Sequence, residues 1–239
     1  MSNPKPIRAW AFSGILCSGK DFIADEAGLC KIGFADPIYQ MTEYFCGTSD
    51  KSIPGVRRFM QKVGQWGWGK LDDADPDYQW TIERVLFIQK LKEIGSAVFG
   101  NGYGDVDVNQ FGKIKSFWAD ILERRMDDLL AYRRLEARGH TGVGVVNVRF
   151  PHELELISRR GIKHYLVDCT QETQQARLKA KGAVLTQAEL HDTSEHFAAE
   201  LRKTLPPEQI IWNDDDYEKP HQDYLSVTEF LEQMEGCPT

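Results

Sequence analysis

One octapeptide near the amino end constrains this chain more than any other feature. Residues 14–21 read Gly-Ile-Leu-Cys-Ser-Gly-Lys-Asp, and they lie between an apolar segment, 7–12, and a helical pattern, 21–27. The spacing G-x-x-x-x-G-K is typical of phosphate-binding loops, in which glycines allow backbone N–H groups to point at an anion and the lysine neutralises terminal phosphates. A strand before the loop and a helix after it are the context that this motif requires. The contacts predicted for a bound ATP are Gly14, Cys17, Ser18, Gly19, Lys20 and Asp21.

The last position of the octapeptide departs from the usual pattern. Asp21 stands where Ser or Thr normally contacts a magnesium ion. A carboxylate is also a hard oxygen ligand, so one interpretation makes Asp21 a ligand of Mg²⁺. The other interpretation is an ordinary helix N-cap or first-turn acid, which the helix dipole stabilises.

The composition is that of a globular protein that does not enter a membrane. The chain has 239 residues, 41% hydrophobic and 27% charged, with no apolar run of membrane-spanning length. Its start lacks the apolar core of a signal peptide, so a cytoplasmic location is expected, in the host if the chain is phage-encoded. Five cysteines without a C-x-x-C pair predict neither a disulfide framework nor a zinc site. The net charge of −7 disfavours a broad duplex-DNA surface, and the acidic runs 72–77 and 213–216 are expected to be solvated loops.

The order of predicted elements indicates an α/β fold. Strands are expected at 7–12, 31–37, 143–148, 163–168 and 209–213, and helices at 21–27, 38–45, 54–61, 81–94, 115–138, 152–160, 171–181 and 226–234. Strand–helix–strand succession predicts a parallel sheet flanked by helices. We expect one domain over residues 1–239, with a glycine- and aromatic-rich insertion at about 65–114 and a lid at about 171–190.

Five segments in chain order resemble the bacteriophage deoxynucleoside monophosphate kinases, which are P-loop kinase-like enzymes. They are the octapeptide, Phe34-Ala35-Asp36-Pro37, Arg58-Phe59-Met60-Gln61-Lys62-Val63-Gly64, Val148-Arg149-Phe150-Pro151-His152-Glu153, and His191-Asp192-Thr193-Ser194-Glu195. The resemblance covers most of the chain outside 65–114. It implies transfer of the γ-phosphoryl group of ATP to a deoxynucleoside monophosphate, with Mg²⁺, on a parallel sheet with a lid.

The resemblance also suggests roles for individual residues. The catalytic candidates are Lys20, Asp21, Arg149 and Arg177, and the substrate-binding candidates are Asp36, Arg58, Gln61, Trp118, Arg149, Glu153, Ser194 and Glu195. Arg149 follows a strand, where open parallel sheets bind ligands, and its guanidinium suits an acceptor phosphate. Each role has a structural alternative: a surface ion pair for Arg149, a solvated face for Arg58 or Arg177, a helix cap for Asp36 and a core-flanking position for Gln61.

Two departures leave other functions open. Asn147 stands at a strand end where the family has Asp, and it cannot supply an anionic ligand. The aromatic residues of the insertion, with Trp118, could instead stack on a base, which would suit a kinase that phosphorylates a hydroxymethylated pyrimidine within DNA. A non-catalytic nucleotide-binding protein is the third interpretation. The expected partner is therefore a small nucleotide, with DNA only in the second case, and nothing in the sequence decides for or against a homodimer.

Overall fold

The computed structural model describes residues 8–51, 53–67, 89, 93, 117–131, 135, 139–182, 193–214 and 217–236. The chain divides into two compact units, the first formed by Met1–Gly33 with Arg133–Thr239 and the second by Phe34–Tyr132. Within the described ranges, no helix is both long enough and apolar enough to cross a membrane.

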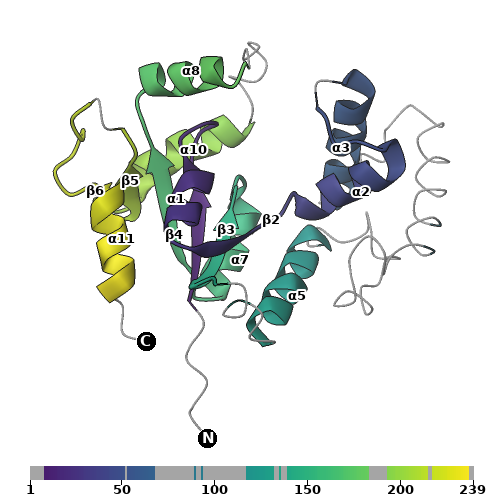
Figure 1. The fold of residues 1–239 in the computed structure, drawn as a ribbon, viewed down its shortest axis with the longest axis horizontal. Helices are drawn as coiled ribbons and strands as arrows, with labels where there is room; N and C mark the ends of the chain where they lie inside the picture. The colour runs from purple at the N-terminus through teal and green to yellow at the C-terminus, as the bar shows by residue number, and fades with distance from the viewer. Residues whose placement is uncertain are drawn as a thin grey trace, which may run out of the picture. The chain divides into compact units, whose positions relative to one another are not determined.

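The first unit contains a six-stranded parallel sheet with helices on both faces (Figure 1). Its strands are β1 (Ala9–Ser13), β2 (Leu29–Gly33), β3 (Gly142–Val146), β4 (Lys163–Asp168), β5 (Ile210–Trp212) and β6 (Leu225–Ser226), in the order β2-β3-β1-β4-β5-β6. Its helices are α1 (Lys20–Glu26), α7 (Pro151–Arg159), α8 (Gln171–Ala180), α10 (Thr193–Thr204) and α11 (Val227–Gly236), with a 3-10 turn, η3 (Pro207–Gln209). The predicted α/β class and parallel sheet are confirmed. The two-residue strand β6 was not predicted, because a pair this short has no periodicity.

The central strands are buried on both faces, which explains their continuous apolar character. All five residues of β3 are buried, and Ala11 and Phe12 of β1 are fully enclosed. Strand β1 lies between β3 and β4, with Phe12 paired to Val146 on one side and to Tyr165 on the other. The strand before the octapeptide therefore lies at the centre of the sheet.

Different side chains of β4 contact the helices on the two faces. Tyr165 belongs to a core formed with α1 and α11, in which its ring meets those of Phe12 and Phe230 at centroid distances of 6.5 and 4.9 Å. Leu166 belongs to a second core with Ala198 and Leu201 of α10. This alternation follows from the period of two along a strand, and it holds the carboxyl end of β1 in a rigid frame.

The second unit contributes helices α2 (Asp36–Cys46), α3 (Pro54–Gly67) and α5 (Phe117–Ala131). Helices α2 and α3 are in contact, with the Phe45 and Phe59 rings 5.9 Å apart. Helix α3 extends six residues beyond the predicted end at 61. The predicted insertion at 65–114 lies outside the described residues except for 65–67, 89 and 93, as does most of the predicted helix 81–94.

Candidate functional site

The octapeptide lies at the carboxyl end of β1, where the connections of neighbouring strands diverge. From β1 the chain runs through α1 to β2 on one side of the sheet, whereas from β4 it runs to β5 on the other side. Open parallel sheets bind ligands outside such a switch point. The fold therefore presents residues 14–19, which we call the 14–19 loop, at a favoured location for a ligand.

Both glycines of the 14–19 loop are required by its geometry. Gly14 and Gly19 have φ values of 147° and 100°, which residues with a side chain rarely adopt. A Cβ atom on Gly14 would lie 2.2 Å from the Val167 carbonyl oxygen, and one on Gly19 would lie 1.9 Å from Asn213 Nδ2. Cys17 also adopts a left-handed conformation, with φ 62°. The loop is thus wrapped tightly against β4 and the end of β5.

Lys20 is held against the same loop although it carries a charge. Its side chain is buried, and Nζ donates hydrogen bonds to the Gly14 and Ile15 carbonyl oxygens at 2.9 and 2.7 Å. The Ser18 hydroxyl is fully buried beside it and has no hydrogen-bond partner within the described part of the chain. Buried hydroxyl groups are normally paired, so the Ser18 side chain is a polar group in this loop that still has bonding capacity.

Helix α8 braces the outer side of the loop. Gln174 Nε2 donates to the Leu16 carbonyl at 2.9 Å, and the Arg177 guanidinium donates to the Ser18 carbonyl at 3.1 Å. Arg177 also donates to the Asn213 carbonyl at 2.9 Å and, over 3.4 Å, to that of Cys17. The Leu16, Cys17 and Ser18 carbonyl groups are thus held by side chains of α8, whereas those of Gly14 and Ile15 accept from Lys20. Arg177, predicted as a catalytic lid residue, is therefore engaged in holding the loop, and lid movement of 171–190 stays a prediction.

The end of β5 supplies the anchor for both the loop and α8. Asn213 Nδ2 donates to the Ser18 carbonyl at 2.7 Å. The Asp214 carboxylate accepts from Thr170 N and Oγ1 at 3.0 and 2.6 Å and from Thr173 Oγ1 at 2.9 Å, which fixes the start of α8. The expectation of a solvated loop at 213–216 is wrong for Asn213 and Asp214, which are both buried, because these bonds compensate for their lost hydration.

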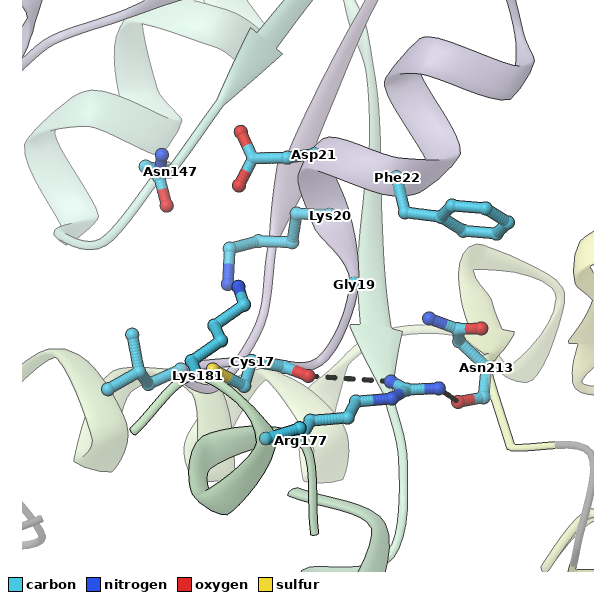
Figure 2. Close-up of a pocket in the computed structure, with 11 residues that line it drawn as sticks. Cys17, Gly19, Lys20, Asp21, Phe22, Asn147, Arg177, Lys181 and Asn213 are labelled. Carbon is cyan, nitrogen blue, oxygen red and sulfur yellow. Dashed lines mark hydrogen bonds between the residues drawn. The ribbon is translucent and has the colours of Figure 1, made fainter. Parts of the chain in front are cut away.

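A cavity of about 530 Å³ opens beside the loop (Figure 2). This volume lies within the range of small-molecule sites, about 300–1,000 Å³. The residues that line it are Leu16, Cys17, Gly19, Lys20, Asp21, Phe22, Asn147, Arg177, Ala180, Lys181 and Asn213. Three cationic side chains and one carboxylate give this lining a net positive charge, and Figure 2 shows the Lys20 and Lys181 side chains directed toward one another. Such an arrangement favours a multiply charged anion.

Asp21 and Asn147 each provide a side-chain oxygen atom near the start of α1 and the end of β3. Asp21 is exposed in the first turn of α1, whose N-cap is Gly19, so Asp21 is not the N-cap but does occupy the predicted position of a first-turn acid. Asn147 directly follows β3 with φ 64°, a conformation that asparagine tolerates better than most residues. Its Oδ1 accepts a long hydrogen bond, 3.4 Å, from the Arg149 guanidinium. Within the described ranges, no three His, Cys, Asp or Glu side chains gather as a metal site.

Glu153, predicted to bind substrate, is committed to the turn between β3 and α7. It is buried, and its Oε2 atom accepts from Arg149 N at 2.6 Å and Phe150 N at 3.1 Å. Burial raises the pKa of the carboxyl group to about 8, although these two hydrogen bonds and the Arg149 charge act in the opposite direction. Glu153 therefore orients the backbone of Arg149, while the Arg149 guanidinium donates to Asn147.

The remaining predicted substrate residues are described only in part. Asp36 lies in the second unit and forms a 2.8 Å ion pair with Arg125, and Arg58 and Gln61 are exposed on α3. The side chain of Trp118 on α5 lies outside the described residues, as do those of Ser194 and Glu195 on α10. Their proposed roles stay predictions.

Five lining residues have no assigned site role in the sequence analysis, and three of them, Phe22, Lys181 and Asn213, carry an aromatic or polar side chain. Phe22 belongs to the predicted helix 21–27, Lys181 ends the predicted lid helix, and Asn213 ends a predicted strand. Position gives a signal for two of them, because Phe22 lies in the first turn after the loop and Asn213 follows a strand at the ligand-binding edge. No periodicity distinguishes Lys181, which directly follows α8, from the basic residues within that helix.

The comparisons with known proteins leave the resemblance untested. No protein-family model matches the chain, and a search of curated proteins gives no match. The similarity to phage deoxynucleoside monophosphate kinases rests on the five sequence segments alone.

Proposed function

We propose that this chain is an ATP-dependent phosphotransferase whose acceptor is a deoxynucleoside monophosphate. The observation that carries the proposal is the cavity beside the 14–19 loop, which combines converging lysines with an exposed carboxylate. The G-x-x-x-x-G-K spacing and the two sterically required glycines support interpreting the loop as a phosphate-binding P-loop.

The polar groups of the cavity fit a triphosphate. Two ammonium groups directed toward one another repel, and a polyanion between them converts this repulsion into attraction. Lys20 can exchange its carbonyl partners for phosphate oxygens, and the Ser18 hydroxyl can donate to a ligand atom. The brace from Arg177 occupies the Cys17 and Ser18 carbonyl groups, so these two dipoles are compensated and oppose a bound anion less.

The oxygen atoms of Asp21 and Asn147 also fit a magnesium ion that is held mainly by phosphate and water. Mg²⁺ typically takes one or two carboxylates with substrate phosphates and retains several waters, so a single carboxylate suffices. Asp21 is the charged ligand in this scheme, and Asn147 is a neutral one. When bound, the ion would offset the negative charge that accumulates on the transferred group.

The acceptor follows from the resemblance, and the reaction balances as a simple transfer. An oxygen of the monophosphate bonds to the γ-phosphorus, the bond from that phosphorus to the β–γ bridging oxygen breaks, and ADP leaves. Arg149 is suited to bind the acceptor phosphate, since its guanidinium makes only the 3.4 Å bond to Asn147 within the described part of the chain.

The test incubates the protein with γ-labelled ATP and Mg²⁺ against separate dNMPs, free nucleosides and hydroxymethyluracil-containing DNA. We expect label in a dNDP, and we expect Lys20→Ala to abolish the transfer. Lys179→Ala is the matched control, because Lys179 is an exposed lysine on α8 that does not line the cavity.

Each other result contradicts a defined part of the proposal. Label retained on DNA would favour the polymer-directed kinase, whereas ATP binding without transfer to any acceptor would favour a non-catalytic nucleotide-binding protein. Undiminished transfer by Lys20→Ala would show that the 14–19 loop is not the phosphate site.

A further inference from the structure

Phe22 is an apolar side chain that the fold leaves exposed at the cavity. It is 52% exposed, and it is one of the large hydrophobic residues at the surface of the described chain. It also lines the cavity, unlike Tyr217, another exposed aromatic residue of the first unit. Its neighbours Ile23 and Ala24 are fully buried in the core, so the backbone that carries Phe22 is fixed. An exposed aromatic ring on a rigid helix is suited to contact a ligand.

The cavity has two chemically different ends. Figure 2 shows the Phe22 ring and the Asn213 side chain on one side, away from the ends of the Lys20 and Lys181 side chains. The cationic end fits phosphate, whereas the end with Phe22 offers an apolar face with a neutral amide nearby. A ligand that satisfies both ends has a polyphosphate at one end and a flat, partly apolar group at the other.

The amide of Asn213 adds a directed polar group at the second end. Its nitrogen donates to the Ser18 carbonyl, which fixes the orientation of the amide plane. Its Oδ1 atom has no hydrogen-bond partner among the residues that the structure describes, so it remains an acceptor. A heterocyclic base carries N–H groups at its edge that suit such an acceptor.

We propose that Phe22 and Asn213 form the recognition surface for the nucleobase of the triphosphate, with Phe22 stacking on the base. This inference rests on the proposed function and specifies it further, because it distinguishes a nucleoside triphosphate from an inorganic polyphosphate. Stacking on a base would cover the exposed face of the Phe22 ring, which is 52% exposed in the structure.

The experiment measures equilibrium binding of ATP and of inorganic tripolyphosphate by calorimetry, with Mg²⁺, to the full chain. We expect Phe22→Ala to weaken ATP binding about tenfold and to leave tripolyphosphate binding within about twofold, because base stacking on one aromatic ring accounts for a change of that order. Phe22→Trp should retain ATP affinity, and Tyr217→Ala is the control for loss of an exposed aromatic residue elsewhere.

The outcomes separate this inference from the function on which it rests. If the wild-type chain binds neither ligand, the proposed function fails. If both ligands bind and Phe22→Ala changes neither affinity, or changes both equally, the base contact is refuted while the phosphate site stands. A Phe22→Ala variant with altered oligomeric mass and unchanged ATP affinity would instead assign the ring to a protein interface. Because the side chain is exposed, a thermal melt should show that the variant folds normally.

Discussion

Arg177→Ala distinguishes two roles for Arg177 that the sequence leaves open: a lid residue that contacts bound phosphate, and a structural residue that holds the 14–19 loop. As a lid residue, Arg177 would act only on bound phosphate, and Arg177→Ala would leave the free chain as stable as before. In the structure, the guanidinium instead donates to the Ser18 and Asn213 carbonyls at 3.1 and 2.9 Å, and more weakly to that of Cys17. A hydrogen bond from a charged donor contributes about 1.5–3 kcal/mol when both partners are buried. Because Arg177 is only half-buried, we take roughly 1 kcal/mol for each short bond and expect a loss of about 2 kcal/mol.

The assay is urea unfolding without nucleotide, followed by circular dichroism. With an m value of about 2 kcal/mol/M, a loss of about 2 kcal/mol should lower the urea midpoint by roughly 1 M. Lys179→Ala, which removes an exposed charge two residues away on the same helix, should change the midpoint little. An Arg177→Ala midpoint equal to that of wild type and Lys179→Ala would refute the brace and restore the lid interpretation.

Three further perturbations test other parts of the site. Gly19→Ala should lower the free energy of unfolding by more than about 2 kcal/mol, because the added Cβ would lie 1.9 Å from the buried Asn213 Nδ2 atom and the backbone φ of 100° strains a residue with a side chain. Gly55→Ala is the control: it has open space around it and a helical backbone, so it should be neutral or stabilising in the same urea titration. Burial lowers the pKa of His164 to about 4, below its ordinary value of 6.5, so the stability that the neutral ring contributes is complete above pH 6.5 and is lost as the pH falls toward 4. His164→Gln should remove that part of the pH dependence of the unfolding free energy, and parallel wild-type and variant profiles would contradict this expectation. Asp21→Asn should raise the Mg²⁺ concentration for half-maximal phosphoryl transfer several-fold in a metal titration, and an unchanged requirement would exclude Asp21 as a ligand.

The sheet was predictable because its signals are local. Strands β1 and β3 are largely apolar runs, β4 has the apolar centre Tyr165-Leu166-Val167, and Gly161, with φ 65°, follows α7 where the sequence indicated a helix end. Strand β6 could not be predicted, because its two residues take strand geometry only through pairing with β5. Asp214 escaped prediction for a similar reason. Its buried carboxylate is stabilised by hydroxyl donors 41 and 44 residues earlier in the chain, which the local sequence does not reveal. The composition of residues 213–216 alone indicated a solvated acidic run.

The site was predictable where backbone geometry determines residue type. The two glycines and Lys20 follow from the motif, and the structure gives each a steric or hydrogen-bonding reason. The partners of polar side chains were not predictable, since they depend on which distant segment lies opposite. The Arg177 bonds to carbonyl groups and the Glu153 bonds to backbone N–H groups could not be inferred from spacing. Phe22 was overlooked because a hydrophobic residue in a helical pattern is normally assigned to the core.

Asn147, which follows β3, is the residue that most directly opposes a catalytic interpretation, because the family that the chain resembles has an aspartate at this position. The conformation and contacts of Asn147 give a physical reason for an asparagine here. Asn147 adopts a left-handed conformation that asparagine accommodates, and its oxygen atom faces the Arg149 guanidinium at 3.4 Å. An aspartate there would form an ion pair with Arg149 and hold that arginine in place. The neutral amide leaves the guanidinium weakly bound, and under the proposed function this makes it available to an acceptor phosphate. It also leaves Asp21 as the single carboxylate among the cavity-lining residues, so the metal dependence of any transfer should be concentrated on Asp21.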